Sequence, residues 1–221
     1  MGVRAKKIST QNEPFRRRPI LTTEGPEWAM RLQVMAERDS GGYRDDPDTH
    51  LLSATGSGDM RAFRRLHQRY RPKVYRFALR LLRRHDQADE VAGDTMLAVW
   101  RGAESFRGAG QPSTWIFGIA YRVAMNMGRR RARDGLHDEL DDQLAAASTD
   151  VGGLPAAFLK EQIAAALRAL PIEQRATIEL AYVYGYRLTE IAEITGCPVG
   201  TVKTRMFHAR NKLRSILGGE G

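Results

Sequence analysis

The chain has 221 residues, of which 28% are charged and 42% hydrophobic, a balance that suits one or two globular domains and excludes a chain disordered throughout. Its formal net charge of +9 favours a polyanionic partner such as nucleic acid. The single cysteine, Cys197, excludes an internal disulfide and a zinc cluster built on cysteines, and no apolar run reaches the roughly 18 residues of a membrane span. Because the basic N-terminus also lacks the apolar stretch of a secretory signal, we expect a cytoplasmic protein.

The first segment, 1–45, differs from the rest of the chain and is expected to be a partly flexible extension. Its first part is polar, basic and without periodicity. Trp28, Leu32 and Met35 then fall at i, i+4 and i+7, which predicts one apolar stripe on a short helix. That stripe could pack on its own domain or dock a partner, and the sequence leaves both open.

Residues 46–134 have the pattern of a helical domain. A short helix around Leu51 and Leu52 ends at the Gly-Ser-Gly of 56–58. Asp59 is predicted to be the N-cap of a long helix, and Asp86 that of the next, which runs to about Ala103. Apolar positions of the long helix step by three and four, as a core-facing helix requires; they are Phe63, Leu66, Tyr70, Val74, Phe77, Leu81 and Leu82.

An acidic cluster lies on the helix that follows Asp86. Asp89, Glu90 and Asp94 share its polar face in an otherwise basic protein. Carboxylates favour helix N-termini, so this is either an ordinary solvated helix start or a docking face for a basic partner.

A loop with aromatic and basic residues, 105–115, comes next. Two glycines and a proline interrupt the helical pattern, yet the loop contains Phe106, Arg107 and Trp115. Beyond it, a helix ends in the basic run 129–133. Aromatic rings stack on unpaired bases while arginines neutralise phosphate, so the pattern indicates single-strand binding. Trp115 and Phe117 could equally be core residues.

Composition changes abruptly after this helix. Residues 135–156 contain an acidic stretch followed by glycines and a proline, which predicts an interdomain linker. Helical periodicity resumes in 157–221, with one apolar stripe at Ile163, Leu167 and Leu170 and another at Ile178, Leu180 and Ala181. The sequence thus predicts an all-α fold of two small helical domains joined by a flexible linker.

The end of the second domain predicts a helix-turn-helix. A helix over 188–195 is followed by Gly196, which can adopt the positive φ of a tight turn, and by Pro198, which a first helical turn tolerates. A second helix over 199–217 has an apolar stripe of Val202, Met206, Leu213 and Leu217 and a basic opposite face. Spacing, turn chemistry and charge all favour a DNA-reading helix over a hairpin with a merely solvated face.

Both domains together resemble the sigma-70 family of bacterial RNA polymerase sigma factors, in its extracytoplasmic-function (ECF) group. The motifs that carry this resemblance are the segment 86–107 with its helix and SFRG loop, the helix PSTWIFGIAYRVAMNMGRRRAR, and ALRALPIEQRATIEL followed by GYRLTEIAEITGCPVGTVKTRMFHARNKL. The resemblance implies sigma region 2 at 46–134, a linker at 135–156 and region 4 at 157–221. It covers roughly residues 48–217.

The resemblance also implies roles for named residues. Asp89, Glu90 and Asp94 would bind the β′ clamp of core RNA polymerase, and region 4 would bind the β flap. Single-stranded DNA of the −10 promoter element would meet Phe106, Arg107, Thr114, Trp115, Arg122, Asn126, Arg129 and Arg130. Duplex DNA of the −35 element would meet Thr201, Lys203, Thr204, Arg205, Phe207 and His208. An anti-sigma factor is a further expected partner, and no cofactor or metal is implied.

Four positions depart from the family pattern, among them His208, which stands where an arginine is common. Gly93 stands where Gln is usual, and Arg122 and Asn126 replace the usual Asn and Asp. A free-standing helix-turn-helix regulator is the alternative class, but it has no need of a loop that holds single strands. An enzyme is the weakest alternative, because no metal-ligand spacing, phosphate-binding loop or nucleophile–base pair is evident.

Overall fold

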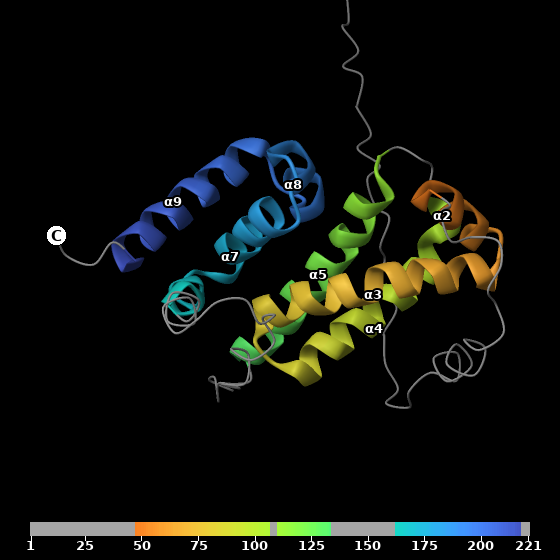
Figure 1. The fold of residues 1–221 in the computed structure, drawn as a ribbon, viewed down its shortest axis with the longest axis horizontal. Helices are drawn as coiled ribbons and strands as arrows, with labels where there is room; N and C mark the ends of the chain where they lie inside the picture. Colours follow the sequence, from red (N-terminus) through yellow and green to blue (C-terminus); the bar gives the residue numbers. More distant parts are fainter. Residues whose placement is uncertain (1–46, 107–109, 134–161, 218–221) are drawn as a thin grey trace, which may run out of the picture. The chain divides into compact units, whose positions relative to one another are not determined.

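The computed structural model describes residues 47–106, 110–133 and 162–217 (Figure 1). Every described residue belongs to one compact unit, Gly41–Gly221. The described residues form helices and no strand, so the all-α class is confirmed. The predicted extension over 1–45, its apolar stripe and the linker over 135–156 lie outside the described residues.

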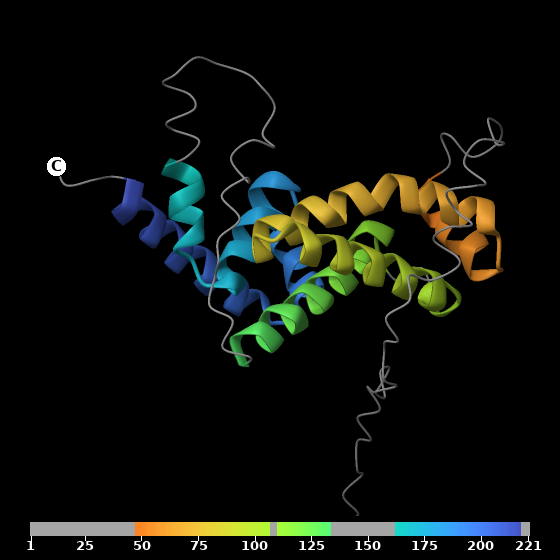
Figure 2. The same ribbon diagram turned by 90° about the horizontal axis from the view of Figure 1, so that it is seen from below.

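Residues 47–133 form an N-terminal helical group. Its elements are α2 (Asp48–Gly56), α3 (Met60–Leu82), α4 (His85–Gly102), the 3-10 turn η2 (Ala103–Ser105) and α5 (Pro112–Arg133). Helix α3 packs against both α4 and α5, and α2 covers one end of this bundle (Figures 1 and 2). The predicted apolar positions of α3 are all buried, which confirms its core-facing periodicity.

Two capping predictions for this group have different outcomes. Asp59 caps α3, because its Oδ1 accepts hydrogen bonds from the backbone N–H groups of Arg61 at 2.7 Å and Ala62 at 3.3 Å. The prediction for Asp86 is wrong: α4 begins at His85 with Arg84 as N-cap, and no side chain caps it. The Asp86 carboxylate instead accepts two hydrogen bonds from the Arg84 guanidinium, which lowers the pKa of Asp86.

A close backbone contact joins α2 to η2. Gly56, the last residue of α2, lies against η2, so that a Cβ atom placed there would be 3.0 Å from the backbone of Ala103 and Glu104. Such a contact is tighter than nearly all Cβ contacts in proteins, so a larger residue at 56 would require η2 to shift.

Residues 162–217 form a C-terminal helical group. Residues 162–168 are helical and are followed by α7 (Ile172–Ile178), the π-helix η4 (Glu179–Val183), α8 (Leu188–Thr195) and α9 (Val199–Leu217). Its core includes Leu170, Ile178, Met206 and Ala209, with Leu167, Ala181, Leu188 and Leu213 packed around them. Ile163 and Leu217 were predicted to belong to the apolar stripes, but both are exposed, so each predicted stripe is one residue too long.

The two helical groups contact each other along α3 and α5. Helix α8 packs against α5, and polar contacts between described residues join α3 to the C-terminal group. Arg80 Nη1 lies 2.8 Å from Glu179 Oε2, and the Tyr184 hydroxyl donates to the Lys73 carbonyl at 3.0 Å. Arg175 donates to the Leu81 carbonyl at 2.9 Å. The same guanidinium also binds the carbonyls of Leu167, Arg168 and Leu170, so it closes the turn before α7 as well.

Candidate nucleic-acid interface

The helix-turn-helix is formed by α8, its turn and α9. Gly196 has φ 65° and ψ 31°, the left-handed conformation predicted for the turn, and Cys197 N–H donates to the Ala192 carbonyl at 3.1 Å. Ile191, Ile194 and Val202 are buried, and α8 packs against both α9 and α5. This packing fixes which face of α9 points outward, and the predicted bounds of both helices are confirmed.

The outward face of α9 carries five of the six residues predicted to contact −35 DNA. Thr201, Lys203, Thr204, Phe207 and His208 are all exposed. Phe207 is 56% exposed, and its ring lies 5.6 Å from that of His208. An exposed large aromatic ring between hydroxyl, amine and imidazole groups offers both apolar and hydrogen-bonding contacts, which base edges in a major groove require.

The sixth residue, Arg205, points elsewhere. It is partly buried, and its Nη1 lies 3.6 Å from Cys197 Sγ. Burial raises the pKa of Tyr121 on α5, and the Arg205 guanidinium beside that phenol opposes the rise. Arg205 therefore spans from the turn to α5 in this arrangement, and it reaches DNA only if this contact is released.

The aromatic loop continues directly into α5. Phe106 and Trp115 are both partly buried, and their rings pack at 5.4 Å with a tilt of 54°. The loop is shorter than predicted, because Pro112 already opens the helix. Thr114 is only 6% exposed, and its hydroxyl has no hydrogen-bond partner in the described part of the chain. Thr114 is thus buried in this arrangement, whereas Arg107 lies outside the described residues.

The remaining predicted −10 residues share one face of α5. Arg122, Asn126, Arg129 and Arg130 are exposed at i, i+4, i+7 and i+8. Opposite them, Ile116, Ala120 and Ala124 are fully buried in the bundle. Three guanidinium groups on one accessible stripe suit phosphate contacts, with Asn126 among them as a polar group that can meet bases.

The acidic cluster on α4 is divided between two environments. Asp89 and Glu90 are exposed, and Asp89 accepts a hydrogen bond from Arg71 of α3 at 2.7 Å. Asp94 is half-buried, and this burial raises its pKa despite the nearby guanidinium groups of Arg101 and Arg130. Asp89 and Glu90 are thus the exposed members of the cluster, and Asp94 is the partly buried one.

Sequence reasoning missed the residues that hold these surfaces in place. Arg71 pairs with Asp89 across 18 positions of sequence, and Tyr121 meets Arg205 across two helical groups. Helical periodicity identifies which face of a helix is polar but not which distant helix faces it. The sequence showed only that Arg71 and Tyr121 each follow a residue of the apolar stripe of their helix.

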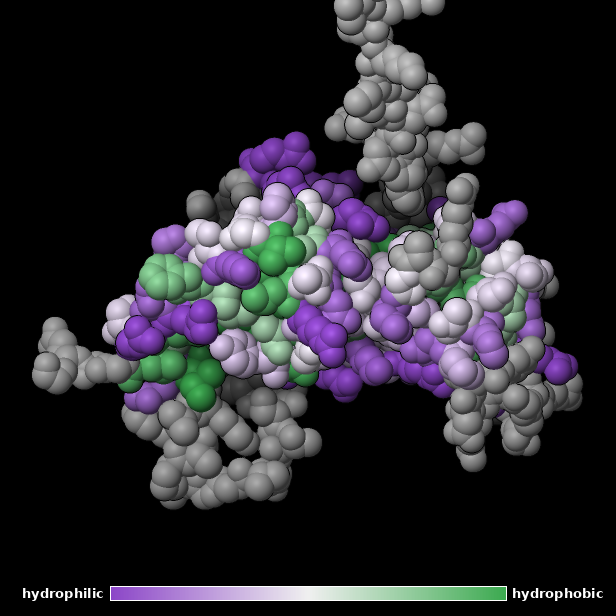
Figure 3. Space-filling model, turned by 90° about the horizontal axis from the view of Figure 1, so that it is seen from above, coloured by the Kyte–Doolittle hydropathy of each residue, from purple (hydrophilic) through white to green (hydrophobic). Residues whose placement is uncertain are grey.

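Among the described residues, no helix is long and apolar enough to cross a membrane. Hydrophilic side chains cover much of the surface, and hydrophobic ones gather mainly over the C-terminal helices, on the left of Figure 3. Exposed hydrophobic residues of that group include Tyr182, Val183, Ile216 and Leu217. A basic helix-turn-helix and a second basic, aromatic surface define a helical DNA-binding transcription protein.

Comparisons with known proteins identify the family. The family model described as Sigma-70 region 2 matches residues 66–134, and that described as Sigma-70, region 4 matches residues 160–213. The ECF RNA polymerase sigma factor SigM of Mycobacterium tuberculosis is 33% identical over 178 residues, which span 80% of this chain and 88% of SigM. The ECF RNA polymerase sigma-E factor of Haemophilus influenzae is 31% identical, over 77% of this chain and 97% of its own. The chain belongs to the sigma-70 family of RNA polymerase sigma factors, in its ECF group.

Solved structures show the same fold. CnrH in complex with the cytosolic domain of CnrY has a TM-score of 0.61 at 23% identity, covering 80% of this chain and all of CnrH. The sigma factor RpoE of Bartonella quintana, in complex with the anti-sigma factor NepR, has a TM-score of 0.57 at 29% identity. That match covers 68% of this chain and 93% of RpoE.

Proposed function

We propose that this protein binds core RNA polymerase in the cytoplasm and directs it to promoters without catalytic chemistry of its own. In this proposal residues 46–134 act as region 2, 135–156 as the linker and 157–221 as region 4. Helix α9 reads the −35 element as duplex, and the loop with α5 holds the −10 element as a single strand. The observation that carries the proposal is the presence of two separate basic surfaces in one chain, the outward face of α9 and the face of α5 that follows the aromatic loop.

The two surfaces require different forms of DNA. Lys203 on α9 supplies a charge-assisted bond to phosphate or guanine, which duplex provides. Phe106 and Trp115 supply rings that stack only on unpaired bases, worth about 1–3 kcal/mol per base. We therefore propose that α9 acts during initial promoter binding and the loop during strand opening.

Two variants separate these steps. Lys203→Gln should weaken binding of the polymerase complex to closed promoter DNA, while Arg214→Gln, in the last turn of α9, should not. Phe106→Leu keeps an apolar contact for Trp115 but removes a stacking ring, so it should spare closed binding and slow opening. Permanganate footprinting should show that a pre-melted bubble restores opening. If both variants fail equally on duplex and the bubble rescues neither, an ordinary helix-turn-helix regulator becomes the better description.

The polymerase contact can be tested through the exposed end of α4. Asp89→Arg should reduce association with core polymerase in gel filtration, because it reverses the charge offered to a basic partner. The exchange Arg71→Asp with Asp89→Arg keeps the ion pair within the protein but inverts its direction. If this double variant binds polymerase normally while Asp89→Arg does not, the pair is structural and the proposed contact is wrong.

An anti-sigma factor is the remaining proposed partner. Support comes from the similarity to RpoE, which was solved in complex with the anti-sigma factor NepR. The exposed hydrophobic residues of the C-terminal group are the proposed contact, since exposed apolar patches mark protein interaction sites.

A further inference from the structure

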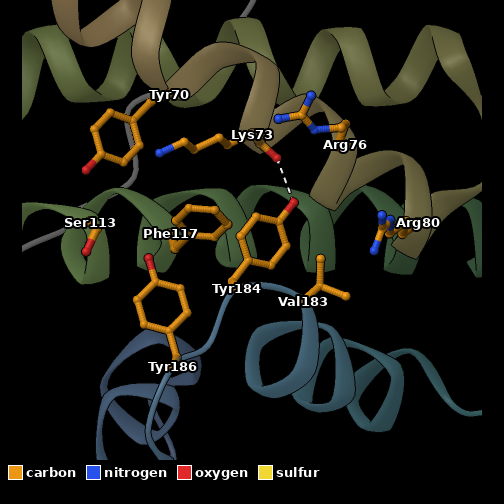
Figure 4. Close-up of a pocket in the computed structure, with 9 residues that line it drawn as sticks. All are labelled: Tyr70, Lys73, Arg76, Arg80, Ser113, Phe117, Val183, Tyr184 and Tyr186. Carbon is orange, nitrogen blue, oxygen red and sulfur yellow. Dashed lines mark hydrogen bonds between the residues drawn. The ribbon is translucent and has the colours of Figure 1, made fainter. Parts of the chain in front are cut away.

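A polar cleft lies where α3, the start of α5 and the segment after η4 meet (Figure 4). Its volume is about 430 Å³, within the usual range of small-molecule sites. The lining residues fall into a cationic side and an aromatic side. They are Tyr70, Lys73, Arg76, Arg80, Ser113, Phe117, Val183, Tyr184 and Tyr186.

The cationic side is a row on α3. Lys73, Arg76 and Arg80 occupy i, i+3 and i+7, so they share one face of the helix, and all three are exposed. Arg80 is already paired with Glu179, and Lys73 Nζ lies 5.2 Å from the centre of the Tyr70 ring. Arg76 makes no ion pair within the described ranges, so its guanidinium is available to an anion.

The aromatic side is formed by three rings in contact. The Phe117 ring centre lies 4.8 Å from that of Tyr184 and 5.5 Å from that of Tyr186. Figure 4 shows the hydroxyl of Tyr186 directed towards Ser113 and that of Tyr184 towards the Lys73 carbonyl. Burial raises the pKa of Tyr184 to about 12, so its phenol stays neutral at ordinary pH and adds no repulsion against an anion.

We propose that this cleft binds a small molecule that combines phosphate groups with a flat ring, the chemistry of a nucleoside triphosphate. Guanidinium and ammonium groups bind phosphate by charge-assisted hydrogen bonds. The partly buried rings of Tyr184 and Tyr186 on the opposite wall can stack on a planar base. Neither wall alone recognises such a ligand, whereas a cleft lined by both suits a molecule with both parts.

Occupancy of the cleft would have a conformational consequence. Lys73 and Arg76 belong to the N-terminal helical group, and Tyr184 and Tyr186 to the C-terminal one. A ligand held by both walls stabilises the state in which the two groups are in contact, because it binds that state and not the separated one. The proposal does not depend on promoter recognition.

The test is isothermal titration of the full chain with ATP, with adenosine and inorganic pyrophosphate as the separate halves of the probe. We expect saturable ATP binding, at least tenfold tighter than either half. Arg76→Gln should weaken it by roughly tenfold or more, as the loss of a charge-assisted bond predicts. Tyr186→Leu should also weaken it, while Arg61→Gln, exposed on the first turn of the same helix, should leave it unchanged.

Three results would overturn the proposal. ATP could fail to bind at millimolar concentration, or pyrophosphate could bind as tightly as ATP, which would leave only a charged patch. A single-stranded oligonucleotide could displace ATP and depend more strongly on Arg76, which would make the cleft part of a nucleic-acid surface. Because no polymerase or promoter is present, failure here leaves the proposed transcription function untouched, and failure of that function leaves this titration interpretable.

Discussion

The contact between Arg80 and Glu179 offers a sharp test of how the two helical groups are held together. The Glu179 side chain is only 4% exposed, whereas that of Arg80 is 41% exposed. Arg80→Met keeps the length of the side chain but leaves a buried carboxylate without this partner. Removing one member of a fully buried pair costs about 3–5 kcal/mol. Since water can reach the space around Arg80, we expect about 1–3 kcal/mol here.

The reverse substitution should cost less. In Glu179→Gln the Arg80 guanidinium remains largely solvated and can still donate to the amide oxygen, so we expect a loss below about 1 kcal/mol. Arg80→Met is expected to cost more than Glu179→Gln because Glu179 is much more buried than Arg80. In an ion pair with both partners exposed, the two substitutions would cost about the same.

Urea unfolding of the full chain measures these losses, with Arg61→Met on the same helix as the control for a surface charge. Small-angle X-ray scattering adds a second readout, because Glu179 can also regain water if the helical groups separate. If the two helical groups separate in Arg80→Met, we expect an increased radius of gyration at low urea. If they stay in contact, we expect the free energy of unfolding to fall by the whole amount given above. Equal effects of Arg80→Met and Glu179→Gln, or no effect of either, would refute the reasoning.

Three further predictions concern other parts of the fold. Gly56→Ala should lower the free energy of unfolding by about 1–3 kcal/mol, because the added Cβ would lie 3.0 Å from the Ala103 backbone. Gly93→Ala should raise the free energy of unfolding by about 0.5–1 kcal/mol, because the space around Gly93 is open. Asp59→Ala should cost about 0.5–2 kcal/mol and speed amide exchange in the first turn of α3. Burial raises the pKa of Tyr184 from 10.0 to about 12. Its contribution to the free energy of unfolding is therefore complete below pH 10 and is lost as the pH rises towards 12. Tyr184→Phe should therefore show a weaker decline in stability than the unsubstituted chain over that interval in chemical denaturation, and an identical decline would contradict the assignment.

Local sequence signals predicted the helices well. Asp59, Gly196 and the apolar steps of α3 act within one or two helical turns, so a single sequence contains nearly all the information about them. Asp86 shows the limit of such signals, because the Arg84 guanidinium binds the carboxylate that would otherwise cap the helix. At Ile163 and Leu217 the periodicity was right, but no helix among the described residues covers these ends of the two stripes.

The candidate site was less predictable because it depends on contacts between distant residues. Exposure of Lys203 and Phe207 follows from the helical wheel of α9 alone. The partial burial of Arg205 does not, since Tyr121 belongs to another helical group. The same is true of Glu179, an acidic residue that reads as a surface position until Arg80 is placed beside it.

The π-helix η4 makes the length of this segment as important as its composition. Tyr184 N–H donates to the Glu179 carbonyl at 3.2 Å, five residues back, so this turn contains one residue more than an α-turn. Deleting one residue between 179 and 183 would allow an ordinary α-turn and rotate the following side chains by about 100° around the helix axis. Tyr184 would then leave the Phe117 ring although no residue of that contact had been substituted. A one-residue gap at this place in an aligned relative therefore marks a different domain contact, whereas the same gap in a surface loop would be neutral.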